Sequence, residues 1–171
     1  TQEKSIKVDD VIAAILKPHQ IEGVKFMWDC CFESVKMIAD PKNEGSGCLL
    51  AHCMGLGKTL QVIALSHTVF AHRTLTKCNR ILILMPVNVQ LNWKAEFVQW
   101  TEKCKNKVQV YDLPSNKLSA KEMLKKRLDT LEKWFQKGGI FLMGYEIFSR
   151  LVHGKDIKQK KQQERFTEYL I

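Results

Sequence analysis

The stretch AHCMGLGKTLQ constrains this chain more than any other. Gly57, Lys58 and Thr59 form the Gly-Lys-Thr end of a phosphate-binding loop, although His52 stands where the full pattern has its first glycine. That first position is the most dispensable one, because the amides that point inward come from the residues after Cys53. The loop follows an apolar run and opens an apolar helical pattern, as an anion site at a helix start requires. We therefore predict a phosphate site here rather than a glycine-rich turn with a chance Lys-Thr.

Each residue type in this loop has its own chemical use. Gly55 and Gly57 let the backbone fold around an anion, because neither carries a β-carbon. Lys58 can reach the β- and γ-phosphates of a nucleotide, and the Thr59 hydroxyl can be a ligand of Mg²⁺. The residues predicted to bind the nucleotide through the loop are Met54, Gly55, Leu56, Gly57, Lys58 and Thr59, with Lys58 and Thr59 as the catalytic pair.

Composition narrows the class of protein. The 171 residues suit one domain, and no apolar run is long enough for a membrane span. The first residue is Thr1, so we expect a piece of a longer protein. A net charge of +9 favours an anionic partner, with nucleic acid as the leading candidate. Solvated helix faces, such as the lysine-rich run from Gly154, account for the charge equally well, and both interpretations stay open.

The six cysteines are predicted to be buried, reduced thiols rather than a disulfide framework. Cys30 and Cys31 are adjacent, no C-x-x-C occurs, and the neighbours are apolar. His52 and Cys53 have no second pair at metal-ligand spacing, so no zinc site is expected from them.

Short apolar runs alternate with helical patterns along the chain. The runs predicted as buried strands are CLLA (48–51), ILILM (81–85), VQVYDL (108–113) and GIFLMGY (139–145). Helices are predicted from Pro18, from the phosphate loop, around 91–100 and up to Gly138, and a last one from Glu146 with an interruption near Gly154. This alternation implies a parallel sheet that is covered on both faces.

Two segments that flank the loop indicate what the nucleotide is used for. Gln20 lies at the start of the first helix, and its amide offers the donor and the acceptor that an adenine edge needs. Downstream, Pro86 follows a strand and Asn88 is a plausible helix cap. A helix start at that place presents free N–H groups, which suits the phosphates of a nucleic-acid backbone.

The combination resembles a known family. LKPHQIEGVKFM, MGLGKTLQ, LMPVNVQLNWKAEF and LMGYEIF occur in the order and spacing of the Q segment, motif I, motif Ia and the following Tyr-Glu segment of Swi/Snf-type helicase-like ATPases. The likeness extends from about residue 15 to 148. AHCMGLGKT, with FMWDCC upstream, is most similar to ATRX-type chromatin remodellers, and the androgen-receptor-interacting helicase type is the second choice. His52 and Cys53 resemble a subfamily variation whose role stays open.

The resemblance implies a fold and a division of the chain. The expected fold is α/β, a three-layer RecA-like P-loop domain with a mostly parallel sheet that is incomplete at its C-terminal end. Residues 1–14 would be a lead-in, and residues 15–171 a partial N-terminal RecA-like lobe. The second RecA-like lobe of the same protein and the family's Asp-Glu-x-His motif are expected outside this sequence.

The resemblance also implies an activity. The full-length protein would hydrolyse ATP with Mg²⁺ while tracking along double-stranded DNA and acting on nucleosomes in the nucleus. Family roles fall on Gln20 for adenine, on the loop for the phosphates, and on Thr59 for Mg²⁺. Pro86, Asn88 and Tyr145 lie in segments that meet the DNA backbone.

Hydrolysis needs more than a phosphate cradle, because an acid must hold the Mg²⁺ water shell and a base must orient the attacking water. The only adjacent acidic pair, Asp9–Asp10, precedes the loop and follows no strand. We therefore expect this chain alone to bind ATP weakly and hardly to turn it over. Two alternatives remain: a non-catalytic nucleotide-binding interaction module and, less favoured, a P-loop small-molecule kinase.

Overall fold

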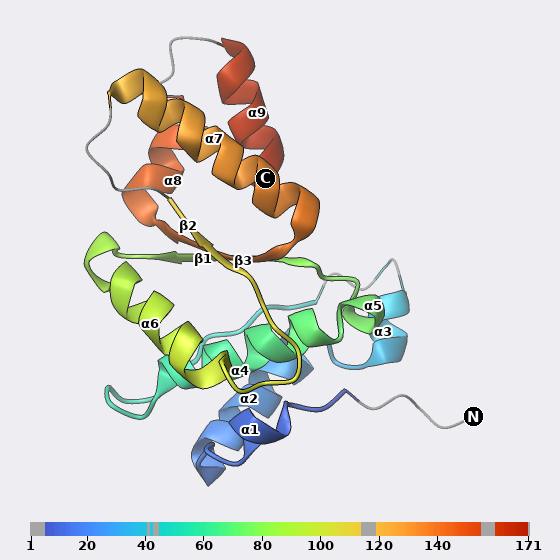
Figure 1. The fold of residues 1–171 in the computed structure, drawn as a ribbon. Coiled ribbons are helices and arrows are strands. Elements are labelled where there is room, and N and C mark those ends of the chain that lie inside the picture. The colour runs from blue at the N-terminus through green and yellow to red at the C-terminus, as the bar shows by residue number, and fades with distance from the viewer. Residues whose placement is uncertain (1–5, 41, 43–44, 114–118, 155–159, 171) are drawn as a thin grey trace. The chain divides into compact units, whose positions relative to one another are not determined.

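The chain folds into two compact units, each with a hydrophobic core of its own (Figure 1). The computed structural model describes residues 6–40, 42, 45–113, 119–154 and 160–170. The first unit comprises Thr1–Asn79 and Ala95–Val108, and the second comprises Arg80–Lys94 and Gln109–Ile171.

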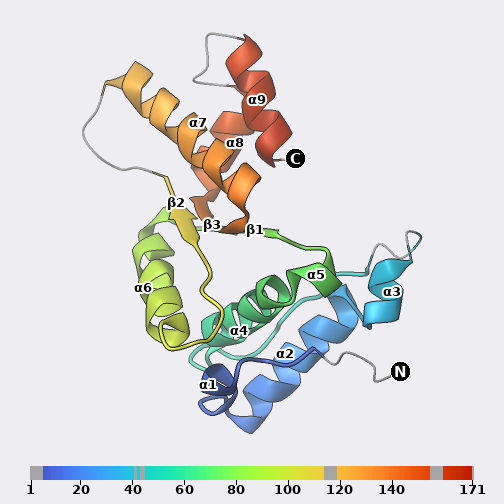
Figure 2. The same cartoon turned by 45° about the vertical axis from the view of Figure 1, so that its right-hand side comes forward.

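The first unit is helical. Its elements are α1 (Asp10–Ala13), α2 (Pro18–Cys31), α3 (Val35–Ala39), α4 (Lys58–Ala71), α5 (Arg73–Thr76) and the later part of α6 (Gln90–Thr101). Pro18 is the first residue of α2, as predicted, because its fixed φ and missing N–H suit that position. α2 and α4 lie side by side (Figure 2), and Val24, Met27 and Ala64 form the core with Ile12.

The strand predicted at residues 48–51 is wrong, because these residues have irregular backbone. Leu49 is 82% exposed, whereas Leu50 packs against the core of the first unit. A strand needs a neighbouring strand for its backbone hydrogen bonds, and CLLA pairs with none in the described part of the chain. Of the two leucines in this run, only Leu50 therefore contributes to the core.

The second unit contains a parallel sheet of the order β1-β3-β2. β1 (Arg80–Met85), β2 (Val110–Asp112) and β3 (Gly139–Gly144) match three of the predicted runs, although β2 is shorter than its run. β1 and β3 are in register from Arg80↔Gly139 to Met85↔Gly144. Every residue of β3 is buried, and β3 is the central strand with a neighbour on either side. The α/β class with a parallel, unclosed sheet is confirmed and is consistent with an incomplete RecA-like domain.

The helices α7 (Ala120–Lys137), α8 (Tyr145–Val152) and α9 (Lys160–Leu170) complete this unit. Leu131 and Trp134 of α7 pack with Phe141 and Met143 of β3. Trp134 Nε1 donates to the Gly139 carbonyl oxygen at 2.9 Å, so the indole is satisfied although it is buried. The predicted interruption near Gly154 is confirmed, since α8 ends at Val152 and α9 begins at Lys160.

Asn88 does not cap a helix, contrary to the prediction. It lies inside a 3₁₀ turn, η1 (Val87–Val89), and Pro86 is the residue that precedes this turn. α6 follows directly from Gln90. Pro86 has an extended backbone with φ −60° and ψ 138°, which already sets the direction of the turn, so no side-chain cap is needed there.

All six cysteines are free, as predicted, but most are not buried. Cys104 is buried, Cys48 and Cys53 are exposed, and the remaining three are half-buried. The apolar neighbours that suggested burial belong to irregular segments as well as to helices, so they do not enclose each thiol. Burial raises the pKa of the Cys104 thiol to about 11, and the adjacent Asp9 carboxylate adds to the shift.

Within the described residues, no helix has both the length and the apolar character that crossing a membrane requires.

The start of α7 generates a stability prediction. The Ser119 hydroxyl accepts from the Glu122 N–H, and the Glu122 carboxylate accepts from the Ser119 N–H in return. The bonds to Ser119 lower the pKa of Glu122. Ser119→Ala should lower the free energy of unfolding by about 1 kcal/mol, the usual contribution of an N-cap, as measured by urea denaturation. Lys133→Ala, at an exposed position of the same helix, is the control and should change it by less than about 0.5 kcal/mol.

Candidate phosphate-binding site

A left-handed residue starts the helix that carries the phosphate loop. Gly57 is the N-cap of α4 with φ 72° and ψ 41°, a conformation that glycine adopts without strain. The first backbone hydrogen bond of the helix runs from the Gln61 N–H to the Gly57 carbonyl oxygen at 3.2 Å. The N–H groups of Lys58, Thr59 and Leu60 therefore have no acceptor within the helix. Together with the positive end of the helix dipole they make an anion-binding site.

The Lys58 ammonium lies over the same loop. Its Nζ donates to the His52 carbonyl oxygen at 2.7 Å and to the Cys53 carbonyl oxygen at 3.0 Å. In this structure the ammonium is therefore bound by two neutral carbonyl groups of the loop. Phosphate oxygens carry full charge and are stronger acceptors than these carbonyls, so a phosphate can compete for the ammonium. Lys58 and the free N–H groups fit an anionic ligand.

The remaining loop residues are arranged for access. Met54 is 98% exposed, and Gly55 has φ 88° with open space where a β-carbon would be. Leu56 is exposed, whereas Thr59 is half-buried in the first turn of α4. The structure therefore brings the predicted phosphate-binding residues together at one helix start, with Met54 and Gly55 facing solvent.

Gln20 is joined to this loop although it is distant in the sequence. It is only 6% exposed, its Oε1 accepts from the Lys17 N–H at 2.9 Å, and its Nε2 donates to the Leu56 carbonyl oxygen at 3.2 Å. A β-carbon on Gly57 would lie 2.3 Å from the Gln20 Nε2. The amide predicted to meet adenine is thus packed against the phosphate loop, with both of its polar atoms bonded.

Two further residues hold the loop and were missed by the sequence interpretation. His19 Nε2 lies 3.2 Å from the Leu56 carbonyl oxygen. Gln61 is fully buried in α4, and its Nε2 lies 3.4 Å from the His52 Nδ1, from the Leu56 carbonyl and from the Gly57 carbonyl. A glutamine in an apolar helix was the available signal, because a buried amide needs partners. The contact also places His52, whose role the sequence left open, beside the loop.

The residues predicted to meet nucleic acid gather at one edge of the sheet in the second unit. Met85 and Gly144 are register partners at the ends of β1 and β3, so the residues that follow these strands emerge together. Pro86 and Asn88 are exposed after β1, and Tyr145 is 55% exposed after β3. The carboxyl edge of a parallel sheet is a frequent place for ligand sites.

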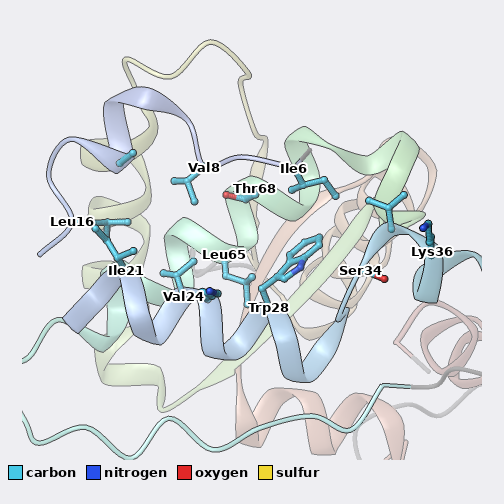
Figure 3. A pocket seen from close by; sticks show the side chains of 13 residues that line it. Ile6, Val8, Leu16, Ile21, Val24, Trp28, Ser34, Lys36, Leu65 and Thr68 are labelled. Carbon is cyan, nitrogen blue, oxygen red and sulfur yellow. The ribbon is translucent and has the colours of Figure 1, made fainter. Parts of the chain in front are cut away.

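A separate apolar pocket of about 570 Å³ lies in the first unit (Figure 3). Its lining includes Ile6, Val8 and Leu16 from the N-terminal segments, Val24 and Trp28 from α2, and Leu65 from α4. None of the predicted nucleotide-binding residues lines it. It has few polar groups to orient a phosphate, so we do not assign it to the nucleotide.

Comparisons with known proteins identify the family. Residues 19–170 match the SNF2-related domain. The transcriptional regulator ATRX of Homo sapiens is 41% identical over 178 residues, which cover 100% of this chain and 7% of that protein. The ATRX homologue of Drosophila melanogaster is 41% identical, with 97% of this chain and 12% of that protein covered. Helicase ARIP4 of Homo sapiens is 33% identical, with 99% and 12% covered. The chain thus spans only a small part of the length of these relatives. The predicted resemblance to Swi/Snf-type proteins of the ATRX type is confirmed.

The two loop glycines generate a paired prediction. Gly55→Ala adds only the strain of a positive φ, about 1–2 kcal/mol, because open space surrounds the new β-carbon. Gly57→Ala adds the same strain and also a clash with the Gln20 amide. Urea denaturation should therefore show a larger loss of unfolding free energy for Gly57→Ala than for Gly55→Ala. Equal losses would mean that the contact between the Gln20 amide and Gly57 contributes nothing to stability.

Proposed function

The chain belongs to the SNF2-related domain family, and we propose that it is the ATP-binding part of a double-stranded-DNA-dependent ATPase that acts on chromatin in the nucleus. The observation that carries the proposal is the start of α4, where free N–H groups and the Lys58 ammonium meet at one loop. A second RecA-like lobe of the same protein would complete the motor.

The roles of the loop residues follow from their chemistry. The N–H groups of Lys58 and Thr59 would bind phosphate oxygens, and the Lys58 ammonium would move from the loop carbonyls to the β- and γ-phosphates. The Thr59 hydroxyl, in the first turn, would be the protein's ligand for Mg²⁺, which neutralises phosphate charge when bound. Gly55 would keep the approach to the phosphates open. These assignments rest on a donor set that matches a polyphosphate in charge and direction.

Adenine recognition is assigned to Gln20. Its amide accepts from the Lys17 N–H and donates to the Leu56 carbonyl oxygen in the loop. A movement of this amide on binding adenine would therefore change a hydrogen bond of the phosphate loop. A purine offers both a donor and an acceptor on its amino edge, which an amide can match. The same side chain would then sense the base and hold the loop.

Contact with DNA is assigned to the sheet edge of the second unit. Pro86, Asn88 and Tyr145 are exposed at the carboxyl ends of adjacent strands, and the net charge of +9 favours a polyanion. Such contacts would be made to the phosphate backbone and would therefore carry little sequence preference. Translocation along DNA on nucleosomes would require the full-length protein.

Hydrolysis is the step that these residues alone do not support. The acids nearest to the strand ends are Asp112, which is paired with Lys94 at 3.0 Å, and Glu146, which stands alone after Tyr145. Neither is part of an acidic pair that could hold the Mg²⁺ water shell and orient a water molecule. We propose that the 171-residue chain binds ATP weakly and has no appreciable turnover by itself.

Replacement of Lys58 tests the nucleotide site. Lys58→Ala should weaken ATP binding by about 1.5–3 kcal/mol, because a charge-assisted contact is lost. This corresponds to about a ten- to hundredfold lower affinity, which isothermal calorimetry can measure. Lys103→Ala, an exposed lysine of the same unit, removes the same charge and should leave the affinity unchanged.

The outcomes separate the alternatives. Equal affinity of the wild type and Lys58→Ala would mean that the loop is not the nucleotide site. Robust ATP hydrolysis by the wild-type chain, lost in Lys58→Ala, would contradict the proposed lack of turnover. For the full-length protein, turnover that does not respond to DNA would favour a metabolic kinase, and binding without any turnover would favour an interaction module.

A second experiment tests the sheet edge. The affinity of the chain for a DNA duplex should fall steeply as salt is raised, since phosphate contacts release counterions. Asn88→Ala should lower the affinity by about two- to tenfold, the contribution of one neutral hydrogen bond, without changing the slope against salt. Gln136→Ala, an exposed amide of α7 that precedes the opposite end of β3, is the matched control. A salt-independent affinity would exclude the DNA assignment.

A further inference from the structure

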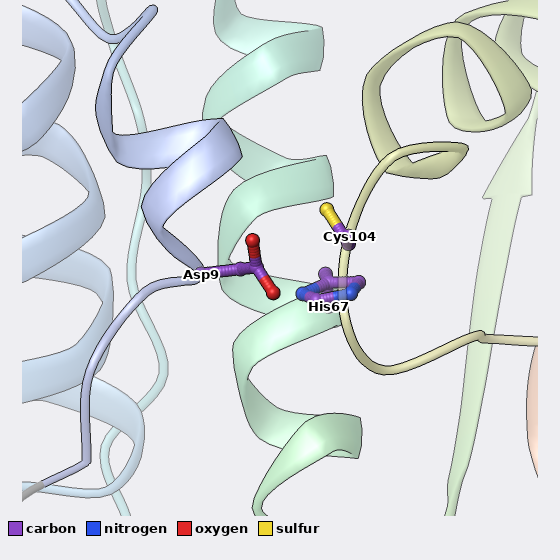
Figure 4. A group of neighbouring side chains, drawn as sticks. All are labelled: Asp9, His67 and Cys104. Atoms are coloured by element: carbon purple, nitrogen blue, oxygen red, sulfur yellow. The ribbon is translucent and has the colours of Figure 1, made fainter.

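Three side chains with metal-binding atoms meet in the first unit (Figure 4). Asp9 precedes α1, His67 lies in α4, and Cys104 follows the end of α6. The carboxylate oxygen, the imidazole nitrogen and the sulfur all lie within 4.8 Å of one another. His67 is fully buried, and Cys104 is 2% exposed. Two of the three side chains therefore belong to the core, and Asp9 is half-buried beside them.

The state of His67 points to a ligand. Its Nε2 lies 2.9 Å from the Asn106 carbonyl oxygen, which can only accept, so Nε2 carries the proton. Nδ1 then presents a lone pair, and it is buried with no hydrogen-bond partner in the part of the chain that the structure describes. A histidine that donates one N–H to a backbone carbonyl and offers its other nitrogen has the arrangement that metal-binding histidines usually have.

Asp9 is held in place with spare acceptor capacity. One of its carboxylate oxygens accepts from the Val11 N–H and the other from the Lys105 N–H, both at 3.1 Å. Each oxygen keeps a further lone pair. The Cys104 thiol donates a weak hydrogen bond to the Trp100 carbonyl oxygen at 3.6 Å, and its sulfur keeps its lone pairs. Backbone groups therefore fix the carboxylate, while its free lone pairs and the sulfur can reach a common centre.

We propose that Asp9, His67 and Cys104 bind one zinc ion, with a water molecule as the fourth ligand. Zinc bonds of about 2.0–2.3 Å place tetrahedral ligands about 3.3–3.8 Å apart, so small side-chain movements suffice to close the cluster. One sulfur, one imidazole and one carboxylate form a set that zinc accepts and that magnesium or calcium does not favour. A thiolate and a carboxylate balance the double charge of the ion, which a buried site requires.

A purely hydrogen-bonded cluster explains less. In that arrangement His67 Nδ1 should accept a proton from a neighbour, yet no such bond exists among the described residues. Asp9 is an acceptor and cannot supply one while it is ionised, and the partners of the Cys104 thiol are the Trp100 carbonyl oxygen and the Asp9 carboxylate rather than this nitrogen. A cation satisfies the nitrogen, the carboxylate and the sulfur together.

The ion would join three segments that are far apart in the sequence. Asp9 belongs to the segment before α2, Cys104 to the loop after α6, and His67 to the helix that begins at the phosphate loop. Its role would be to hold these segments together, because the cluster lies apart from the candidate nucleotide site. This proposal is independent of the proposed ATPase function.

Cobalt is the probe for the site. The metal-free 171-residue chain, kept reduced, should bind one Co²⁺ per chain with the near-ultraviolet charge-transfer band of a cobalt–thiolate bond, and Zn²⁺ should displace it. Cys104→Ser should abolish the band. Cys48→Ser and Cys53→Ser remove exposed thiols and should retain it. A band that survives in Cys104→Ser, or is lost with an exposed thiol, would overturn the proposal.

Asp9→Asn gives an independent test, since asparagine preserves the cap of α1 but loses the charge. It should weaken Co²⁺ binding by at least about tenfold, and Zn²⁺ should raise the melting temperature of the wild type more than that of this variant. X-ray absorption of the zinc-loaded wild type needs no variant at all. It should find one sulfur and otherwise nitrogen and oxygen ligands, whereas a shell with no sulfur or with several would refute the site.

Discussion

The left-handed conformation of Gly57 is the constraint on which the candidate site depends. It ends the loop, starts α4 at Lys58 and leaves the first N–H groups of that helix without internal acceptors. A β-carbon at this position would displace the Gln20 amide, whose Nε2 would lie 2.3 Å from it. The sign of φ therefore favours glycine here, and the absence of a β-carbon also lets the Gln20 amide keep its bonds. These bonds tie the start of α2 to the phosphate loop.

Hydrogen bonds to the Leu56 carbonyl oxygen connect α2 to the phosphate loop. His19 and Gln20 reach it from α2, and Gln61 reaches it from within α4. The Gln61 Oε1 is buried and has no hydrogen-bond partner among the described residues, so the amide is held by its nitrogen alone. A buried oxygen without a hydrogen bond lowers the stability of the fold. The Gln61 amide thus keeps the loop in its conformation at a cost in folding free energy, as is common at functional sites.

Local signals in the sequence predicted most of the elements. Pro18, the run ILILM and the glycines after α7 each act through the backbone of their own segment, so the sequence is sufficient to place them. The strand predicted for CLLA was wrong because a strand forms only beside another strand, and a local sequence pattern does not show whether one is present. The helix cap predicted at Asn88 was wrong because this residue lies inside a 3₁₀ turn that begins after Pro86. The loop residues were predicted from spacing, whereas the bonds of Gln61 and the meeting of Asp9, His67 and Cys104 depend on segments far apart in the chain.

α4 links the two sites of the first unit. Its first residue, Lys58, belongs to the phosphate loop, and His67 lies nine positions later, about 14 Å along a helix that rises 1.5 Å per residue. Ile63 and Ala64, both fully buried, hold the helix between these points. The directions of the free N–H groups are set by the axis of this helix, so any tilt of α4 would misdirect them. An ion on His67 would fix the far part of the same axis to Asp9 and Cys104. The core cluster would then position the phosphate loop without touching it, since a packed helix transmits position along its length.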